Sequence, residues 1–128
     1  MNNPQPWWLT SPVAEVAATI LPYFSSGSHV EEDRALNDIL SWLMTGEYRQ
    51  GFLRLMGGAI ENQFQNPNIC AVGEAMQVLE HAGLIRRVIS GWDNTYVYVG
   101  LTRLGMHALQ TNTVRQHLGL GDAPPTAL

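Results

Sequence analysis

The fold is decided by residues 66–109, which read NPNICAVGEAMQVLEHAGLIRRVISGWDNTYVYVGLTRLGMHAL. Asn66 followed by Pro67 is typical of a helix start, because the asparagine side chain can accept free backbone N–H groups and proline suits the first helical position. Gly83 is placed to end the same helix. These residues therefore predict a helix over 67–82. Its apolar residues recur at helical spacing and form the expected buried stripe: Ile69, Val72, Met76, Leu79 and Ala82.

The period of the apolar residues changes after this helix. Residues 85–89 and 95–101 are rich in β-branched and aromatic side chains, and a Ser-Gly-Trp-Asp-Asn segment joins them. This pattern predicts a hairpin over 85–101. Thr102 can then cap a further helix, which is expected over 102–110.

The N-terminal half contains three more helical patterns. A Ser-Pro pair precedes the first helix, expected over 12–24. Ser28 and Glu31 form a capping-box pattern for a second helix, expected over 29–44. Apolar residues at every fourth position predict a third helix over 47–65, although a Gly-Gly pair interrupts it.

The chain is expected to form one domain with less regular ends. Residues 1–11 combine prolines and a Trp-Trp pair without any period, which favours an extended N-terminal arm. Residues 12–118 are expected to form a single domain of the helices and the hairpin, including a last turn that Thr113 can cap, and 119–128 are expected to be a flexible tail. A length of 128 residues is suited to one hydrophobic core.

The composition favours a folded chain with little attraction for polyanions. Hydrophobic residues make up 45% of the sequence and charged residues 14%, which argues against disorder. The absence of a long apolar run and of a secretory signal pattern, with one cysteine, predicts a cytoplasmic protein that does not enter the membrane. The formal net charge is −4 and every basic residue is arginine. Non-specific binding to DNA depends on Lys and Arg at the phosphates, so this balance weakens it.

Two segments resemble the winged helix-turn-helix superfamily. Residues 79–87, LEHAGLIRR, look like the end of a recognition helix that runs into the first strand of the wing. Residues 101–109, LTRLGMHAL, are similar to the segment after the wing in MarR-like and PadR-like regulators, although such runs also arise at other strand-to-helix junctions. The resemblance covers residues 29–110 or so and implies a mainly α fold with one β-hairpin, a winged helix-turn-helix. A DNA-reading helix would lie at 67–82 and the wing at 90–95.

The resemblance also implies candidate contacts to DNA. The side chains of Asn and Gln can form paired hydrogen bonds with adenine, and a carboxylate can accept a hydrogen bond from cytosine. The alternative interpretation is that these side chains form an ordinary solvated helix face without a ligand. Arg86 and Arg87 are neighbours on a strand and point to opposite faces, so one is expected to reach a phosphate while the other packs or pairs. Trp92 at the wing tip can touch a groove or fold back over the core. The candidate nucleic-acid-binding residues are Asn68, Glu74, Gln77, Arg86, Arg87, Trp92 and Asn94.

The function that the resemblance implies is a DNA-binding transcriptional regulator whose partner is double-stranded DNA. A homodimer is expected through the first and the C-terminal helices, because Val13, Val16 and Ile20 form an apolar stripe outside the minimal winged core. The low positive charge leaves an alternative open. The chain would then be a winged-helix protein–protein interaction subunit that does not bind DNA, with Trp7, Trp8, Trp92 and the acidic start of the second helix as contact surfaces.

The sequence predicts no catalytic, cofactor or metal site. The four histidines have no i, i+4 pair, which is the spacing of a helical metal face. Cys70 lies near a predicted helix start, where a thiol can become reactive, yet a small packing residue is the simpler interpretation. No phosphate-binding glycine loop and no nucleophile motif is present, so an enzyme is not expected.

Overall fold

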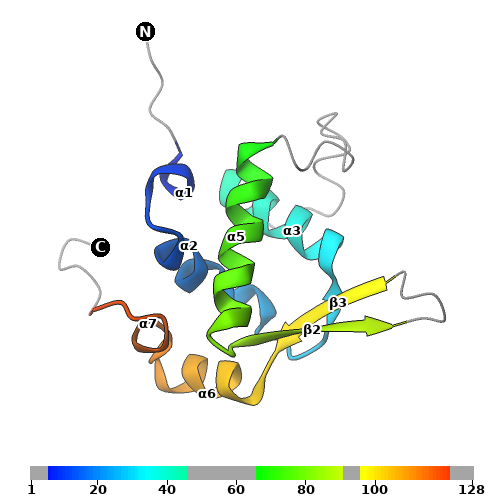
Figure 1. The fold of residues 1–128 in the computed structure, drawn as a ribbon, viewed down its shortest axis with the longest axis vertical. Helices are drawn as coiled ribbons and strands as arrows, with labels where there is room; N and C mark the ends of the chain where they lie inside the picture. The colour runs from blue at the N-terminus through cyan, green and yellow to red at the C-terminus, as the bar shows by residue number, and fades with distance from the viewer. Residues whose placement is uncertain (1–5, 46–65, 91–95, 122–128) are drawn as a thin grey trace, which may run out of the picture.

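The computed structural model describes residues 6–45, 66–90 and 96–121. It is mainly helical with a small three-stranded antiparallel sheet, which confirms the predicted class of an α-rich chain with a hairpin. Helix α5 stands in the centre, α1 and α2 lie on one side of it, α3 lies on the other, and the hairpin and α6 lie below (Figure 1). The elements are α1 (Trp7–Thr10), α2 (Val13–Ile20), the 3₁₀ turn η1 (Leu21–Phe24), β1 (Val30–Glu31), α3 (Glu32–Thr45), α5 (Pro67–His81), β2 (Ile85–Ser90), β3 (Tyr96–Leu101), α6 (Arg103–Thr111) and α7 (Val114–His117).

Helix α5 begins and ends as the sequence predicts. The side-chain oxygen of Asn66 accepts two backbone N–H groups of the first turn, at 2.9 and 3.4 Å. Gly83 adopts the left-handed φ of +79°, and its N–H and that of the next residue return to carbonyls of the last turn. This is a Schellman arrangement, which satisfies carbonyls that would otherwise lack partners.

The sheet contains a strand that the sequence pattern did not predict. Val30 pairs with Val99, so β1 lies beside β3 and the strand order is β1-β3-β2. The second helix, expected from 29, therefore begins at Glu32, and the capping box expected from Ser28 and Glu31 does not mark its start. Long-range strand pairing has overridden the local capping pattern here.

The hairpin and the helix after it confirm the prediction. Strands β2 and β3 pair over their whole length, from Ile85 opposite Leu101 to Ser90 opposite Tyr96. The Thr102 hydroxyl accepts the N–H of Gly105 at 2.9 Å and so caps α6. A Cβ at Gly105 would overlap the backbone of the residue before β2, so glycine allows α6 to pack directly against that junction.

Helix α2 packs against α5 and supplies much of the core. Val16, Ala17 and Ile20 are almost fully buried there. The apolar stripe that suggested a dimer contact is thus covered by the chain's own α5, and Val13 remains 37% exposed. The homodimer stays a prediction that no longer has this stripe as its basis.

The two ends of the chain differ from the expected arm and tail. Part of the predicted extended arm, Trp7–Thr10, is the helix α1, because Trp8 docks onto the core and orders it. The predicted first helix changes to a 3₁₀ turn at its end, where Pro22 lies. The expected last turn is α7, with Thr113 at its N-cap position, but the Thr113 side chain makes no capping hydrogen bond, so only the capping part of the prediction is wrong. Beyond α7 the Arg115 Nε donates to the Gly121 carbonyl at 2.7 Å, which holds the start of the predicted tail.

Several predictions fall outside the described residues. They are the helix over 47–65, the wing residues Trp92 and Asn94, and the last part of the tail. None of the described helices is long and apolar enough to cross a membrane.

Candidate functional site

Helix α5, which the sequence predicts as the DNA-reading helix, has two unlike flanks. One flank packs against α1 and α2, and the other turns toward α3 and the sheet (Figure 1). Glu74 and Gln77 are exposed on α5, as predicted. Asn68 is not free, because its side-chain oxygen accepts the Trp8 indole N–H at 2.8 Å. The amide expected to read a base therefore holds the N-terminal helix in place.

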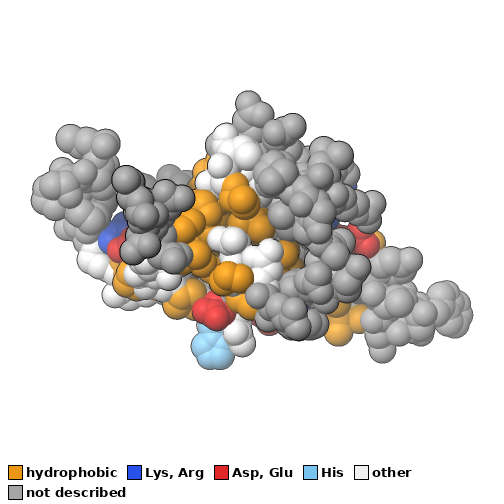
Figure 2. All heavy atoms as spheres, turned by 90° about the horizontal axis from the view of Figure 1, so that it is seen from above, with side chains coloured by type: hydrophobic (Ala, Val, Ile, Leu, Met, Phe, Trp, Pro, Cys, Tyr) orange, Lys and Arg blue, Asp and Glu red, His pale blue; other side chains and the backbone are white. Residues whose placement is uncertain are grey.

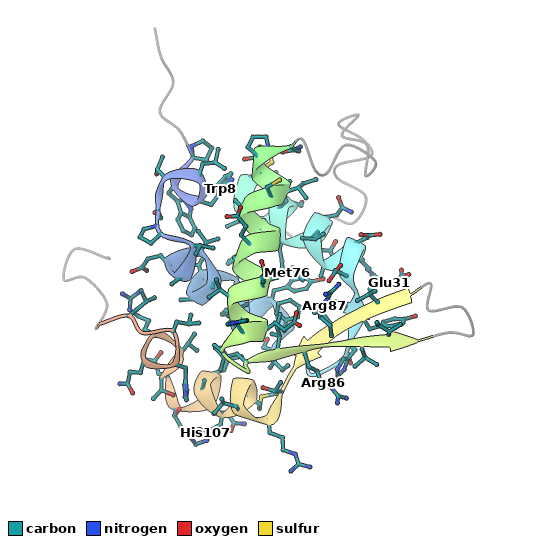
Figure 3. All side chains as sticks on the ribbon, in the orientation of Figure 1. Trp8, Glu31, Met76, Arg86, Arg87 and His107 are labelled. Atoms are coloured by element: carbon teal, nitrogen blue, oxygen red, sulfur yellow. The ribbon has the colours of Figure 1, made fainter. Side chains whose placement is uncertain are left out.

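The two neighbouring arginines of β2 diverge as strand geometry requires. Arg86 lies on the outer face of the sheet, where its Nε donates to His29 Nε2 at 3.2 Å. The His29 ring lies against Gly100, at which a Cβ would come within 2.7 Å of it. Arg87 points to the opposite face, toward α3 and α5 (Figure 3). One of the two arginines was expected to pair within the protein, and Arg87 does so with carboxylates. The contact of the other with a phosphate stays a prediction.

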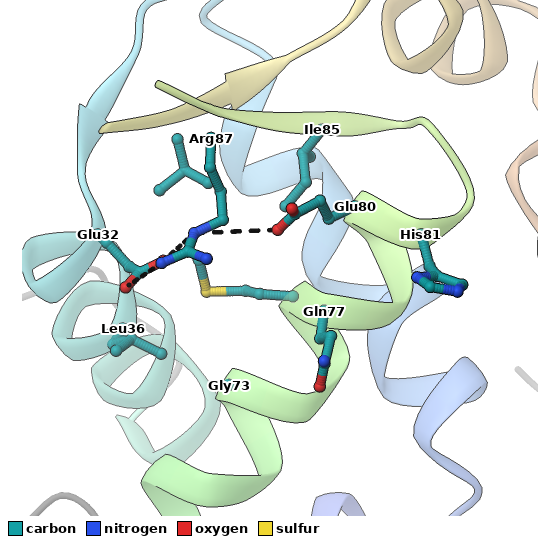
Figure 4. A pocket seen from close by; sticks show the side chains of 10 residues that line it. Glu32, Leu36, Gly73, Gln77, Glu80, His81, Ile85 and Arg87 are labelled. Carbon is teal, nitrogen blue, oxygen red and sulfur yellow. Dashed lines mark hydrogen bonds and ion pairs between the residues drawn. The ribbon is translucent and has the colours of Figure 1, made fainter. Parts of the chain in front are cut away.

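Arg87 is held between two carboxylates from different helices. Its Nε lies 2.8 Å from one oxygen of Glu32 at the start of α3 and its Nη2 donates to the other at 3.3 Å. Glu80, near the end of α5, lies 3.9 Å from the same Nε (Figure 4). The Arg87 side chain is 45% exposed, so water still reaches this cluster.

This cluster lines one part of a groove of about 310 Å³ between α3, α5 and the sheet. We call it the α3–α5 groove. Its apolar lining comes from all three walls: Leu36, Met76, Ile85 and Val99. Its polar lining consists of Glu32, Gln77, Glu80, His81 and Arg87, and Gly73 completes it. Beyond the groove, the pair Ile89 and Val97 continues the same sheet face, and Ile89 is 61% exposed.

The arginines of the described residues are largely neutralised. Five of them are described, and three form ion pairs with carboxylates: Arg34 with Asp38, Arg87 with Glu32 and Glu80, and Arg115 with Glu15. On the face drawn in Figure 2, hydrophobic side chains fill the middle and basic atoms occupy small areas at the sides. The charge that a phosphate backbone needs is therefore not concentrated around the described part of α5.

The groove is a site that the sequence did not indicate. The candidate list contained Arg87 and Gln77 but neither of the two carboxylates that line the groove, Glu32 and Glu80. Met76, predicted as core, is 6% exposed and also contributes to the groove wall. The signal that was present is strand alternation at Arg86 and Arg87, which requires one of them to face the helices. The carboxylates that pair with this arginine are set by the packing of α3 against the sheet, and no local sequence pattern predicts that packing.

The described residues hold no group of three or more metal-ligating side chains. Cys70 is a half-buried cysteine on α5. Comparisons of this chain with protein families, with curated proteins and with solved structures find no match. The groove's own chemistry is therefore the basis for a function.

Proposed function

We propose that this chain is a winged-helix module that recognises a protein partner through the α3–α5 groove. The order of elements supports the winged-helix part. Helix α2, strand β1, helices α3 and α5, and then the hairpin follow one another, with β3 between the other two strands. The helices, the hairpin and the helix α6 after it agree with the order that the resemblance implies, and β1 is an additional strand. The helix expected over 47–65, which would precede α5 in a helix-turn-helix, lies outside the described residues.

A protein partner is favoured over DNA by one observation. The arginine on the α5 side of the hairpin, Arg87, is already neutralised by Glu32 and Glu80. A surface that meets phosphates needs free cations, whereas this one combines carboxylates with a groove that is partly apolar. Grooves of mixed apolar and polar lining are suited to side chains of another protein.

Filling the groove tests the proposal. Gly73 lies on its α5 wall, and an added Cβ would meet nothing closer than 4.0 Å, so Gly73→Gln can extend a neutral side chain into the groove without a clash. Peptides selected from a random display library on the full chain should bind Gly73→Gln at least about tenfold more weakly. Gly73→Ala is the matched control, because it adds a methyl group and leaves the groove open. Equal binding to all three proteins, or no selected peptide, would contradict the proposal.

A DNA-binding regulator is the second candidate, which the exposed Gln77 and Glu74 on α5 favour. Selection from a random duplex pool at physiological salt is its test. If DNA is bound, the combined change of Arg86 and Arg87 to alanine should weaken all duplexes, and Gln77→Ala should cost about 1–3 kcal/mol on the preferred site. A homodimer would present two such helices to two half-sites. Failure to enrich any duplex would leave the protein partner as the function.

A further inference from the structure

We infer that the partner segment carries a basic residue beside a bulky apolar one, and that Arg87 occupies the basic position while the groove is empty. The inference rests on the proposed function and specifies the chemistry of the ligand. It follows from two properties of the groove, its apolar walls and its charge, and each is taken in turn.

The apolar walls define the first half of the ligand. Leu36 is half-buried at the groove, and Met76 lines it from α5. Methionine adapts to side chains of different shape because it is unbranched and flexible. Ile89, 61% exposed at the end of the same sheet face, extends the apolar surface along the hairpin. An extended segment lying along this surface can place one large apolar side chain in the groove.

The charge defines the second half. The groove is lined by two carboxylates, Glu32 and Glu80, by the guanidinium of Arg87 and by the imidazole of His81, which is counted as neutral in the formal charge. Two acidic groups against one basic group leave an excess of negative charge, so a cation on the partner is favoured and an anion is not. The guanidinium already between the carboxylates shows which group this geometry accepts (Figure 4).

Arg87 can be displaced by such a partner. Its side chain is 45% exposed, and the side chains of Glu32 and Glu80 are 29% and 43% exposed. Ion pairs as exposed as these contribute little to stability, because water competes for both charges. A Lys or Arg of the partner can therefore take a carboxylate while Arg87 turns to solvent. Arg87 thus competes with the partner.

The test measures whether peptide affinity rises or falls when the positive or the negative charges of the groove are removed. Peptides selected on the full chain are synthesised with labels, each beside a version in which every Lys and Arg is replaced by Glu. Arg87→Gln should raise the affinity for the basic peptide about two- to fivefold, because the competitor is gone. The double change Glu32→Gln and Glu80→Gln should lower it about tenfold. Fluorescence anisotropy measures both, and circular dichroism confirms that the variants fold.

Matched controls separate this local effect from net charge. Arg86→Gln removes the same charge from the opposite sheet face, and Glu31→Gln with Glu74→Gln removes two carboxylates that do not line the groove. These variants should bind the peptide within twofold or so of the original chain.

Each other outcome overturns a defined part. Enrichment of acidic or neutral peptides, or weaker peptide binding by Arg87→Gln, would overturn the inferred ligand while a protein partner remained. Affinity changes equal to those of the controls would also overturn it. No enriched peptide at all would overturn the proposed function itself.

Discussion

The two flanks of α5 show how one helix can serve stability on one side and remain open on the other. Toward α2, the contact is dry, and Val16, Ala17 and Ile20 are at most 2% exposed. Toward α3 and the sheet, charged side chains 29–45% exposed surround an apolar groove. The flank toward α2 exposes almost no surface to a partner, whereas the flank toward α3 keeps exposed charged side chains beside a groove. A binding surface on this chain is therefore expected where packing is incomplete.

The largest difference between the flanks should appear on truncating one apolar residue from each. Ile20→Ala removes a fully buried side chain facing α5 and should lower the free energy of unfolding by about 2–5 kcal/mol. Leu36→Ala removes a half-buried side chain at the groove, where water can fill the space, and should cost about 1 kcal/mol. Chemical denaturation of both variants gives the two values. Equal losses would mean that the groove is as closely packed as the α2 side.

The sequence predicts the first flank better than the second for a physical reason. Apolar residues at helical spacing are enough to place Ile69, Val72 and Leu79 in the core, and Asn66 and Gly83 mark the helix ends by local backbone chemistry. These signals lie within one element.

The groove depends on meetings between distant elements. Arg87 reaches Glu32 across 55 positions of sequence, and Asn68 is engaged by Trp8 across 60. The β1 pairing that brings the start of α3 to the sheet involves two residues, too few for a periodic pattern. Candidate residues could therefore be named on α5 and β2, but their partners could not.

The contact of α1 with α5 gives the next prediction. Trp8→Phe keeps most of the aromatic ring but removes the N–H that donates to Asn68, and should lower the free energy of unfolding by about 0.5–1.5 kcal/mol. Trp7→Phe is the matched control, because Trp7 is 40% exposed and its indole has no hydrogen bond among the described residues. Thermal or chemical unfolding should separate the two variants. If Trp7→Phe proves the more damaging change, α1 is held by a different contact.

The packed side also contains a titratable contact between α2 and α7. Arg115 donates to both oxygens of Glu15, at 2.7 and 3.0 Å. These hydrogen bonds lower the pKa of Glu15 below its ordinary value of 4.5; partial burial opposes the shift, and the positive charge of Arg115 adds to it. A lowered folded-state pKa stabilises the fold above pH 4.5, and this contribution disappears as the pH falls through the folded pKa.

Glu15→Gln should therefore be less stable than the original chain at pH 7, and the difference should shrink below pH 4.5 or so as the carboxylate is protonated. Urea unfolding across this range measures it. Glu31→Gln is the control, since Glu31 is exposed and has no ion-pair partner among the described residues. A difference that is independent of pH would assign the effect to packing instead of charge.

The smallest effect on stability is expected for Arg87 in the charged cluster at the groove. Arg87→Gln breaks contacts with Glu32 and Glu80, but the three side chains remain 29–45% exposed, so the loss should be about 0–1 kcal/mol. The loss should also shrink when salt rises from 0.05 to 1 M or so, because salt screens exposed charges, whereas the Trp8→Phe loss should not change. Unfolding of both variants at two salt concentrations tests this. A loss of several kcal/mol for Arg87→Gln would mean that the cluster stabilises the fold, and Glu32 and Glu80 could not then release Arg87 to bind a cation of the partner. A small, salt-sensitive loss would leave both carboxylates available for binding.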